Sequence, residues 1–500
     1  MGTLSADLGI IGSGSGNSLI TPFWDGKRVV LADRGTGPER VFGGTCLNVG
    51  CIPTKMFVRP AALARGPEEA ARLNVAQQTL GVDWPGMRDR VFSRIDAISE
   101  GGRQYREELE NVELLSETVT LAPDLVAGRE RAGAFGFTAA SGAEVEAEQL
   151  VIAAGSRAVL PEVPGIDLPQ VHTSDSVMRL EEMPSRVLII GGGYIACEFA
   201  GIFSGLGAEV IQANRSVGLM SALDEEVSRA YSARAEQSWS VLYERTLGQV
   251  LPRGERGTSG AAGEGAGRVT AQLVTSDGRE EDYEVDIVLV AIGRRPNSDL
   301  VGAEQAGLDL HDDGRIAVDE HQRVLVGGTP VEGLYALGDV SSEDQLKHVA
   351  NHEARVVAHN LENPDNLRPS RRHAVPSAVF SHPELAKVGL TGAQAAQEVG
   401  EENLTVKVQT YGDTAYGWAM EDRHGIFKVI ADRRDGRILG AHAMGPQASN
   451  LIQPVVQAMS LGQDAHTVAR GQYWIHPALM EVTENALLGL EVPVPEGAPL

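Results

Sequence analysis

Two cysteines lie close together in the segment GGTCLNVGCIPTK, residues 43–55. Cys46 and Cys51 are separated by four residues, and the chain contains one further cysteine, Cys197. Close thiols can bind a metal, exchange with a disulfide, or pack as small apolar side chains. A zinc site needs four soft or imidazole ligands, and neither a second cysteine pair nor a histidine cluster stands nearby, so we expect no metal. We assign simple packing to Cys197, whereas the sequence around the pair favours redox chemistry.

An imidazole and a carboxylate form a second possible reactive group near the C-terminus. In YWIHPALMEVTENALLGL, His476 precedes Pro477 at the start of an expected helix, and Glu481 follows five residues after the histidine. A carboxylate beside an imidazole fixes its tautomer and raises its basicity, as a general acid or base requires. Taken alone, however, a His-Pro pair at a helix start is more typical of capping or packing.

A glycine-rich turn near the N-terminus predicts an element that could serve this chemistry. An expected apolar strand enters GSGSGN, residues 12–17, and the next expected strand ends in Asp33. Glycines let backbone N–H groups approach a pyrophosphate at a helix N-terminus, and the acid can bind ribose hydroxyls. Asn17 stands at the third glycine position and Pro22 follows it closely. The packing of the expected helix against its strand must therefore differ here.

The same pattern occurs a second time. The expected strand RVLII, residues 186–190, enters GGGYIA, residues 191–196, and apolar residues then recur at helical spacing. The strand after this helix ends in Asn214 and Arg215, where an acid would bind the ribose of NADH. Because an arginine can pair with a 2′-phosphate, the sequence favours NADPH over NADH, the alternative being an ordinary surface arginine.

Three further segments place a strand before a glycine turn. VIAAGSRAVLP, residues 151–161, and VLVAIGRRPNSDL, residues 288–300, are consistent with crossings between two nucleotide-binding units. In LYALGDVSS, residues 334–342, Asp339 follows a strand and could meet the hydroxyls of a polyol chain or a ribose. The Gly-rich segment 252–270 predicts a long exposed hairpin loop without chemistry.

Composition restricts the classes of function. The chain is 42% apolar and 22% charged, as in a large globular protein, and its formal charge of −25 disfavours nucleic acid as a partner. No basic region followed by an apolar stretch opens the chain, and no run of roughly eighteen apolar residues occurs. We therefore expect a cytoplasmic protein with no membrane partner. The C-terminal part has alternating strands and helices without a glycine fingerprint, which indicates an α+β domain.

The order of these features resembles that of the flavoprotein disulfide reductases, which include glutathione reductase and dihydrolipoamide dehydrogenase. GGTCLNVGCIPTK and HPALMEVTENAL carry the resemblance, which extends over nearly the whole chain. It implies an α/β fold with two Rossmann-like dinucleotide-binding domains and a C-terminal α+β dimerisation domain. The implied division is an FAD-binding domain at 1–156 and 288–358, an NADPH-binding domain at 157–287, and an interface domain at 359–500.

The resemblance also implies which residues form the sites. Lys55 and Glu198 match an ion pair beside the flavin N5, and Tyr194 matches an aromatic gate over the flavin. The residues implied to bind FAD are Gly12, Gly14, Gly16, Asp33, Gly44, Thr45, Lys55, Gly155, Gly338 and Asp339. Those implied to bind NADPH are Gly191, Gly193, Tyr194, Ile195, Asn214, Arg215 and Gly293.

The chemistry that the resemblance implies is a relay from NADPH through FAD to a Cys46–Cys51 disulfide. Cys51, nearer the helix start, is the thiol whose thiolate the helix dipole can stabilise against the flavin. Cys46 is then free to attack an external disulfide. His476, oriented by Glu481 and contributed by the other subunit of a homodimer, would protonate the thiolate that leaves the substrate.

Several segments are similar to those of family members that reduce mycothione, the disulfide of mycothiol. They are GSGSGNSLITPFW, GCIPTKMFV, GVDWPGMRDRVFSRID and GAHAMGPQASNLIQ. The sequence therefore predicts a reductase of this small-molecule disulfide. Two alternatives remain: dihydrolipoamide dehydrogenase or another low-molecular-weight disulfide reductase, and a flavin-binding redox sensor without catalysis.

Overall fold

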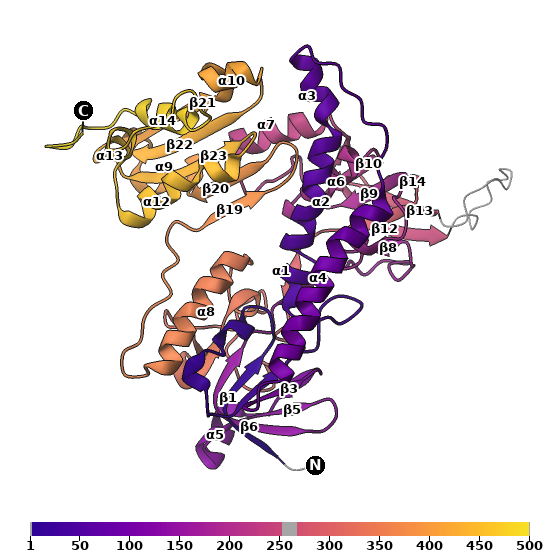
Figure 1. Cartoon of the computed structure of the whole chain (residues 1–500), viewed down its shortest axis with the longest axis vertical. Coiled ribbons are helices and arrows are strands. Elements are labelled where there is room, and N and C mark those ends of the chain that lie inside the picture. The colour runs from indigo at the N-terminus through magenta and orange to yellow at the C-terminus, as the bar shows by residue number, and fades with distance from the viewer. Residues whose placement is uncertain (1–2, 253–267, 500) are drawn as a thin grey trace.

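We describe the protein from a computed structural model of the full chain, which covers residues 3–252 and 268–499 (Figure 1). Most of the hairpin loop expected at 252–270 lies outside these residues. Three regions are arranged around separate sheets, with the C-terminal region beside the helices that follow the cysteine segment. Within the two described stretches, no helix combines the length and apolar character that crossing a bilayer requires.

The first region is built on an eight-stranded sheet whose central strands are parallel. The order β18-β6-β1-β2-β3 runs through parallel pairs, and β17 and β5 add antiparallel edges. Buried apolar side chains on both faces suit such a sheet, which helices must cover on each side. The strands are β1 (Leu4–Ile11), β2 (Val29–Ala32), β3 (Val112–Leu115), β4 (Val119–Leu121), β5 (Phe135–Ala139), β6 (Glu144–Ile152), β17 (Arg323–Val326) and β18 (Thr329–Ala336).

No α-helix connects β1 to β2, although a nucleotide-binding unit normally has one there. Two short 3-10 turns replace it, η1 (Gly16–Leu19) and η2 (Pro22–Trp24). The expected helix N-terminus at the first fingerprint is therefore missing, because the segment is short and Pro22 starts a new turn. The helices of this region are α1 (Gly44–Asn48), α2 (Cys51–Ala64), α3 (Gly66–Arg72), α4 (Trp84–Glu107), α5 (Leu125–Ala132) and α8 (Lys347–Glu362), with the 3-10 turn η4 (Gly338–Val340).

The second region repeats the parallel pattern and keeps its helix. Its five strands are parallel in the order β11-β10-β9-β15-β8, and α6 follows the second glycine fingerprint directly. The strands are β8 (Val171–His172), β9 (Arg186–Ile190), β10 (Glu209–Asn214), β11 (Ser240–Tyr243) and β15 (Ile287–Val290). The helices are α6 (Tyr194–Gly205) and α7 (Glu225–Ala235), with the 3-10 turn η3 (Val177–Arg179). A three-stranded sheet adds β12 (Arg245–Pro252), β13 (Val269–Thr275) and β14 (Glu280–Val285).

A two-stranded ribbon joins the first and second regions. It pairs β7 (Ser156–Ala158) with β16 (Arg294–Pro296), one from each predicted crossing segment. The predicted domain limits remain a prediction. Most strands belong to the sheet of the region in which the predicted limits place them. The exception is β15, which belongs to the second sheet although it extends past the predicted limit at 287.

The C-terminal region is an antiparallel sheet covered by helices. Its order is β19-β20-β23-β22-β21. The strands are β19 (Pro376–Val379), β20 (Leu385–Gly389), β21 (Leu404–Thr410), β22 (Ile426–Asp432) and β23 (Ile438–Met444). The helices are α9 (Gly392–Val399), α10 (Ala415–Ala419), α11 (Ala448–Leu451), α12 (Gln453–Leu461), α13 (Ala465–Arg470) and α14 (Glu481–Leu488), with η5 (Glu401–Asn403) and η6 (Tyr411–Asp413). The predicted fold class is thus confirmed.

Candidate active site

The cysteine pair lies where α1 leads into α2. Both cysteines are free thiols in this structure. Cys46 accepts hydrogen bonds from the Cys51 thiol and from the backbone N–H groups of Cys51 and Ile52 at the start of α2. The bond from Cys51, helped by the Lys347 ammonium and opposed by burial, lowers the pKa of Cys46 to about 7. The hydrogen bond between the two thiols is thus the main reason why the pKa is lowered at Cys46 and raised at Cys51 in the reduced pair.

The second thiol of the pair stays protonated under the same conditions. The hydrogen bond to Cys46, together with burial, raises the pKa of Cys51. One sulfur is thus a nucleophile near neutral pH while its neighbour holds the proton.

Glycines allow the cysteine segment to touch the first fingerprint. Gly44 has φ 76°, and a Cβ there would lie 2.6 Å from the Cα of Gly14. Gly12 has φ 108°, and a Cβ there would lie 2.2 Å from the carbonyl oxygen of Ala153. A larger residue at position 44 would push α1 away from the fingerprint turn, and one at position 12 would push that turn away from Ala153, which follows β6.

Asp33 is held at the end of β2, beside the fingerprint. The Ser13 hydroxyl donates to its carboxylate at 2.6 Å, and the Ser13 N–H donates at 3.4 Å. Burial raises the pKa of Asp33, and the hydrogen bonds from Ser13 oppose that rise. The carboxylate is thus oriented to accept hydroxyl groups from a ligand.

One cavity of about 500 Å³ connects the fingerprint, Asp33 and the cysteine pair. Among the predicted FAD and catalytic residues, its lining includes Gly12, Gly14, Asp33, Gly44, Thr45, Cys46, Cys51, Gly155, Glu198, Gly338 and Asp339. A long cradle of glycine backbone, with an acid along it, is suited to a dinucleotide. The residues present therefore fit FAD.

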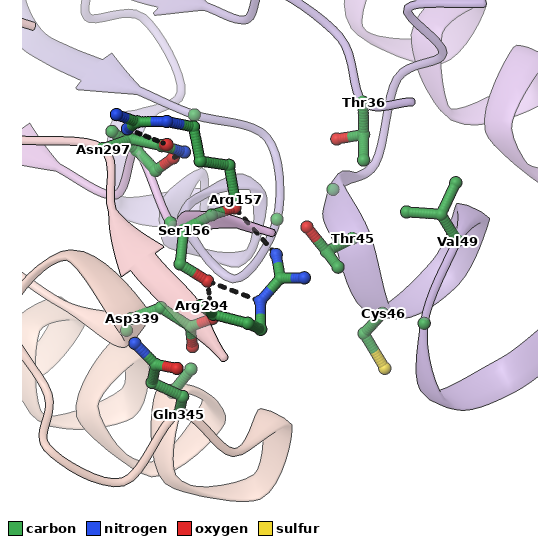
Figure 2. A pocket seen from close by; sticks show the side chains of 18 of the residues that line it. Thr36, Thr45, Cys46, Val49, Ser156, Arg157, Arg294, Asn297, Asp339 and Gln345 are labelled. Atoms are coloured by element: carbon green, nitrogen blue, oxygen red, sulfur yellow. Dashed lines mark hydrogen bonds between the residues drawn. The ribbon is translucent and has the colours of Figure 1, made fainter. Parts of the chain in front are cut away.

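A polar network forms one wall of the cavity, as Figure 2 shows. Arg294 donates to the Ser156 hydroxyl at 2.8 Å, and that hydroxyl donates to Asp339 at 2.6 Å. The two crossing segments and the turn after β18 thus meet at Asp339. On the opposite side of the view lie Thr45 and Cys46.

The predicted ion pair of Lys55 and Glu198 is replaced here by contacts to Phe380. The Lys55 ammonium lies 3.4 Å from the centre of the Phe380 ring, and the Phe380 N–H donates to Glu198 at 2.8 Å. Burial raises the pKa of Glu198 to about 7, although the hydrogen bond and the charge of Lys55 lower it. Glu198 lines the cavity beside Tyr194 and Ile195, at the start of α6.

The other residues predicted for NADPH lie around the end of the second sheet. Gly191 has φ 133°, and a Cβ there would lie 2.2 Å from the carbonyl oxygen of Ala291. The buried Asn214 amide donates to the carbonyl oxygen of Gly218 at 2.7 Å, which shapes the turn after β10. Arg215 is exposed on that turn. Gly193 and Gly293 have open space around them.

His476 and Glu481 meet as the sequence predicts, but away from the cavity. The imidazole Nδ1 lies 2.7 Å from the Glu481 carboxylate. The His476 side chain is 71% exposed and that of Glu481 only 16%. Neither residue lines the cavity with the cysteines. Tyr473 and Ile475, next to the histidine, are large apolar side chains that are also exposed.

The structure adds residues that local sequence patterns do not identify. Ser13 and Ser156 orient the two acids of the cavity, Phe380 contacts both Lys55 and Glu198, and Lys347 adds a charge beside Cys46. Ser13 stands inside a recognised motif, which is a signal that could have found it. Ser156 likewise lies in the crossing segment 151–161, whereas Phe380 and Lys347 come from distant segments that only the fold brings to the site.

Comparison with known families covers most of the chain. Residues 6–355 match the family described as pyridine nucleotide-disulphide oxidoreductase. Residues 375–487 match the dimerisation domain of the same family.

Individual relatives span nearly the full length. The chain is 46% identical to mycothione reductase of Mycobacterium tuberculosis, over 97% of this chain and 99% of the relative. It is 34% identical to dihydrolipoyl dehydrogenase of Haloferax volcanii, over 96% of each chain. It is 31% identical to glutathione reductase of Burkholderia cepacia, over 95% of this chain and 97% of the relative. The solved flavoprotein disulfide reductase RclA from Escherichia coli, a Cu(II) complex, has the same fold, with a TM-score of 0.79 at 23% identity over 98% of this chain and 99% of that chain.

Proposed function

This chain belongs to the pyridine nucleotide-disulphide oxidoreductase family and is an FAD-dependent disulfide oxidoreductase that uses NAD(P)H; within that family, we propose that it uses NADPH to reduce mycothione through Cys46 and Cys51. The observation that carries the proposal is the cysteine pair in the wall of the cavity that fits FAD. The substrate is supported by 46% identity to a mycothione reductase, against 34% and 31% to relatives named for other substrates.

Residues of the first region would hold FAD along the cavity. Gly12 and Gly14 would offer backbone to its diphosphate, Asp33 would accept the ribose hydroxyls of its adenosine, and Asp339 would accept those of its polyol chain. Gly44, Thr45, Gly155, Gly338 and Glu198 also line the cavity, whereas Gly16 and Lys55 do not, although Lys55 follows Cys51 by about one turn of α2. When bound, FAD supplies two-electron chemistry between a nicotinamide and a disulfide.

The reduced pair then acts on the substrate by thiol–disulfide exchange. The Cys46 thiolate attacks one sulfur of the substrate disulfide, so that a mixed disulfide forms and one substrate thiolate leaves. Cys51 attacks the Cys46 sulfur, which releases the second substrate thiol and leaves the Cys46–Cys51 disulfide. One substrate disulfide thereby becomes two thiols. The depressed pKa of Cys46 supplies its nucleophile near neutral pH.

His476 would protonate the leaving thiolate from the second subunit of a homodimer. The histidine is oriented by Glu481, is exposed, and does not line the cavity of its own chain. Its region matches the family's dimerisation domain, and exposed Tyr473 and Ile475 flank it. These observations support a site that two copies of the chain complete together.

NADPH would bind along the second fingerprint. Gly191 and Gly193 offer backbone at the start of α6, where the helix dipole favours phosphate. Arg215, presented by the turn that Asn214 shapes, would pair with the 2′-phosphate. Gly293 lies in the crossing segment, and Tyr194 and Ile195, which line the flavin cavity, would stand between the two sites.

Replacing one thiol tests the proposal. In Cys46→Ser, we expect turnover of mycothione to disappear, while NADPH still bleaches the visible absorbance of bound FAD. The matched variant is Cys197→Ser, a change at a fully buried thiol outside the cavity, which should keep turnover. Disulfide reduction by Cys46→Ser at the wild-type rate would refute the proposed function.

A further inference from the structure

The first fingerprint lacks the element that normally stabilises a diphosphate. In a dinucleotide-binding unit, the N-terminus of the helix after the first strand carries roughly half a positive charge toward the phosphates. Here the glycine turn leads into η1, a 3-10 turn of four residues, and then into η2. Neither turn is long enough to supply such a dipole, although Gly12, Gly14 and Ser15 still line the cavity.

A buried cation is attached to this turn from behind. Arg106 lies in the last turn of α4, and only 8% of its surface is exposed. Its Nε donates to the Asn17 side-chain oxygen at 2.8 Å, and one terminal nitrogen donates to the Asn17 carbonyl oxygen at 2.9 Å. Asn17 is the residue at the third glycine position of the fingerprint. The guanidinium therefore contacts the turn at the residue where the expected helix would begin.

No described carboxylate lies within ion-pair distance of Arg106, and both of its hydrogen-bond acceptors are neutral. Its guanidinium carbon also lies 5.2 Å from the centre of the Tyr105 ring. Burial lowers the pKa of Arg106, but a guanidinium remains charged throughout the physiological range. A buried charge without a counter-ion is costly unless a ligand compensates for it.

A second cation holds the same turn from the cavity side. The Lys347 ammonium, at the start of α8, donates to the Ser15 hydroxyl at 2.9 Å and lines the cavity. Among the described side chains, no carboxylate pairs with it. Two cations from helices far apart in the sequence thus bracket the turn at Ser15 and Asn17.

We propose that Arg106 replaces the missing helix dipole and supplies the positive potential that binds the diphosphate of FAD at the first fingerprint. It acts as a positioning residue, through Asn17 and through its charge, and Lys347 adds to the same potential. This inference rests on the proposed placement of FAD along the first fingerprint. It explains why a segment too short for a helix still forms a nucleotide site.

Variants of Arg106 separate its charge from its hydrogen bonds. Arg106→Gln removes the charge and keeps an amide donor for Asn17, whereas Arg106→Lys keeps the charge with a simpler donor. The matched control is Arg103→Gln on the same helix, a half-buried arginine that is paired with Glu100. Full-length protein is stripped of FAD and titrated with FAD, and the dissociation constant is measured at several salt concentrations. The melting temperature is measured with and without FAD.

We expect Arg106→Gln to weaken FAD binding at least about tenfold and to shrink the rise in melting temperature that FAD causes. The melting temperature of the FAD-free protein should change little, because a buried charge without a counter-ion is removed. Arg106→Lys should recover most of the affinity, and Arg103→Gln should match the wild type. FAD affinity of Arg106→Gln within twofold of wild type would overturn the proposal, and so would Arg106→Lys binding as weakly as Arg106→Gln. Either failure leaves the outcome for Cys46→Ser, and thus the proposed function, untouched.

Discussion

At the scale of single residues, the reactivity of the site depends on which sulfur carries the charge. The hydrogen bond from the Cys51 thiol contributes most to the lowered pKa of Cys46, and the backbone N–H groups at the start of α2 add to it. The proposed nucleophile is thus activated mainly by its own partner thiol. Its pKa near 7 predicts that disulfide exchange rises with pH through neutrality.

Lys347 provides a test of this electrostatic activation. Its ammonium favours the thiolate of Cys46, so Lys347→Met should raise the thiol pKa by about one unit. The thiolate fraction at pH 7 would then fall about fivefold. Iodoacetamide alkylation of Cys46 across pH, in a Cys51→Ser background, measures this directly. Lys27→Met, which removes a lysine that lies over the Phe23 ring, should leave the profile unchanged, and an unshifted profile in Lys347→Met would contradict the assignment.

Arg215 provides the residue-scale test of cofactor choice. Removing a charged hydrogen bond to a phosphate costs about 1.5–3 kcal/mol, which corresponds to roughly 10- to 100-fold in affinity. Arg215→Ala should therefore raise the KM for NADPH by that factor and leave the KM for NADH nearly unchanged. Arg229→Ala, at an exposed arginine paired with Glu225 on α7, is the matched control. An equal rise for both cofactors would show that Arg215 does not read the 2′-phosphate.

At the scale of elements, local patterns predicted the strands and where the candidate site residues lie relative to them. The glycine turns, Asp33, Asp339 and the His476–Glu481 pair all follow a strand or begin a helix, where short-range geometry places them. The patterns failed where packing between distant elements decides. The helix after β1 is missing because the segment before Pro22 is too short, and its substitute, Arg106, comes from α4. No local signal in the sequence points to that contact.

The same limit explains the geometry at Lys55 and Glu198. The residues are 143 positions apart, and Phe380 reaches both from the C-terminal region. The predicted ion pair was inferred from two segments of the sequence. Nothing in those two segments indicates that the Phe380 ring, from a third segment, contacts Lys55. The burial that raises the pKa of Glu198 is likewise a property of the assembled fold.

At the scale of the whole molecule, the proposed mechanism requires two chains. Cys46 of one chain and His476 of the other would form each site, so a dimer of Cys46→Ser and His476→Gln chains has one intact site and one doubly altered site. Co-expression of differently tagged chains should therefore restore about a quarter of wild-type turnover in the mixed population, although each variant alone is nearly inactive. Mixing Cys46→Ser with Cys51→Ser should restore none. Failure of the first mixture to recover would contradict a site that two chains complete together.

The most direct test of the central claim compares substrates with the purified full-length protein. With NADPH as the reductant, kcat/KM is measured for mycothione, glutathione disulfide and lipoamide, and each is repeated with NADH. We predict that mycothione exceeds both other disulfides by at least about a hundredfold, because a site shaped for one polar ligand discriminates against others. We also predict that NADPH exceeds NADH. A higher kcat/KM for glutathione disulfide or lipoamide, or a preference for NADH, would contradict the account.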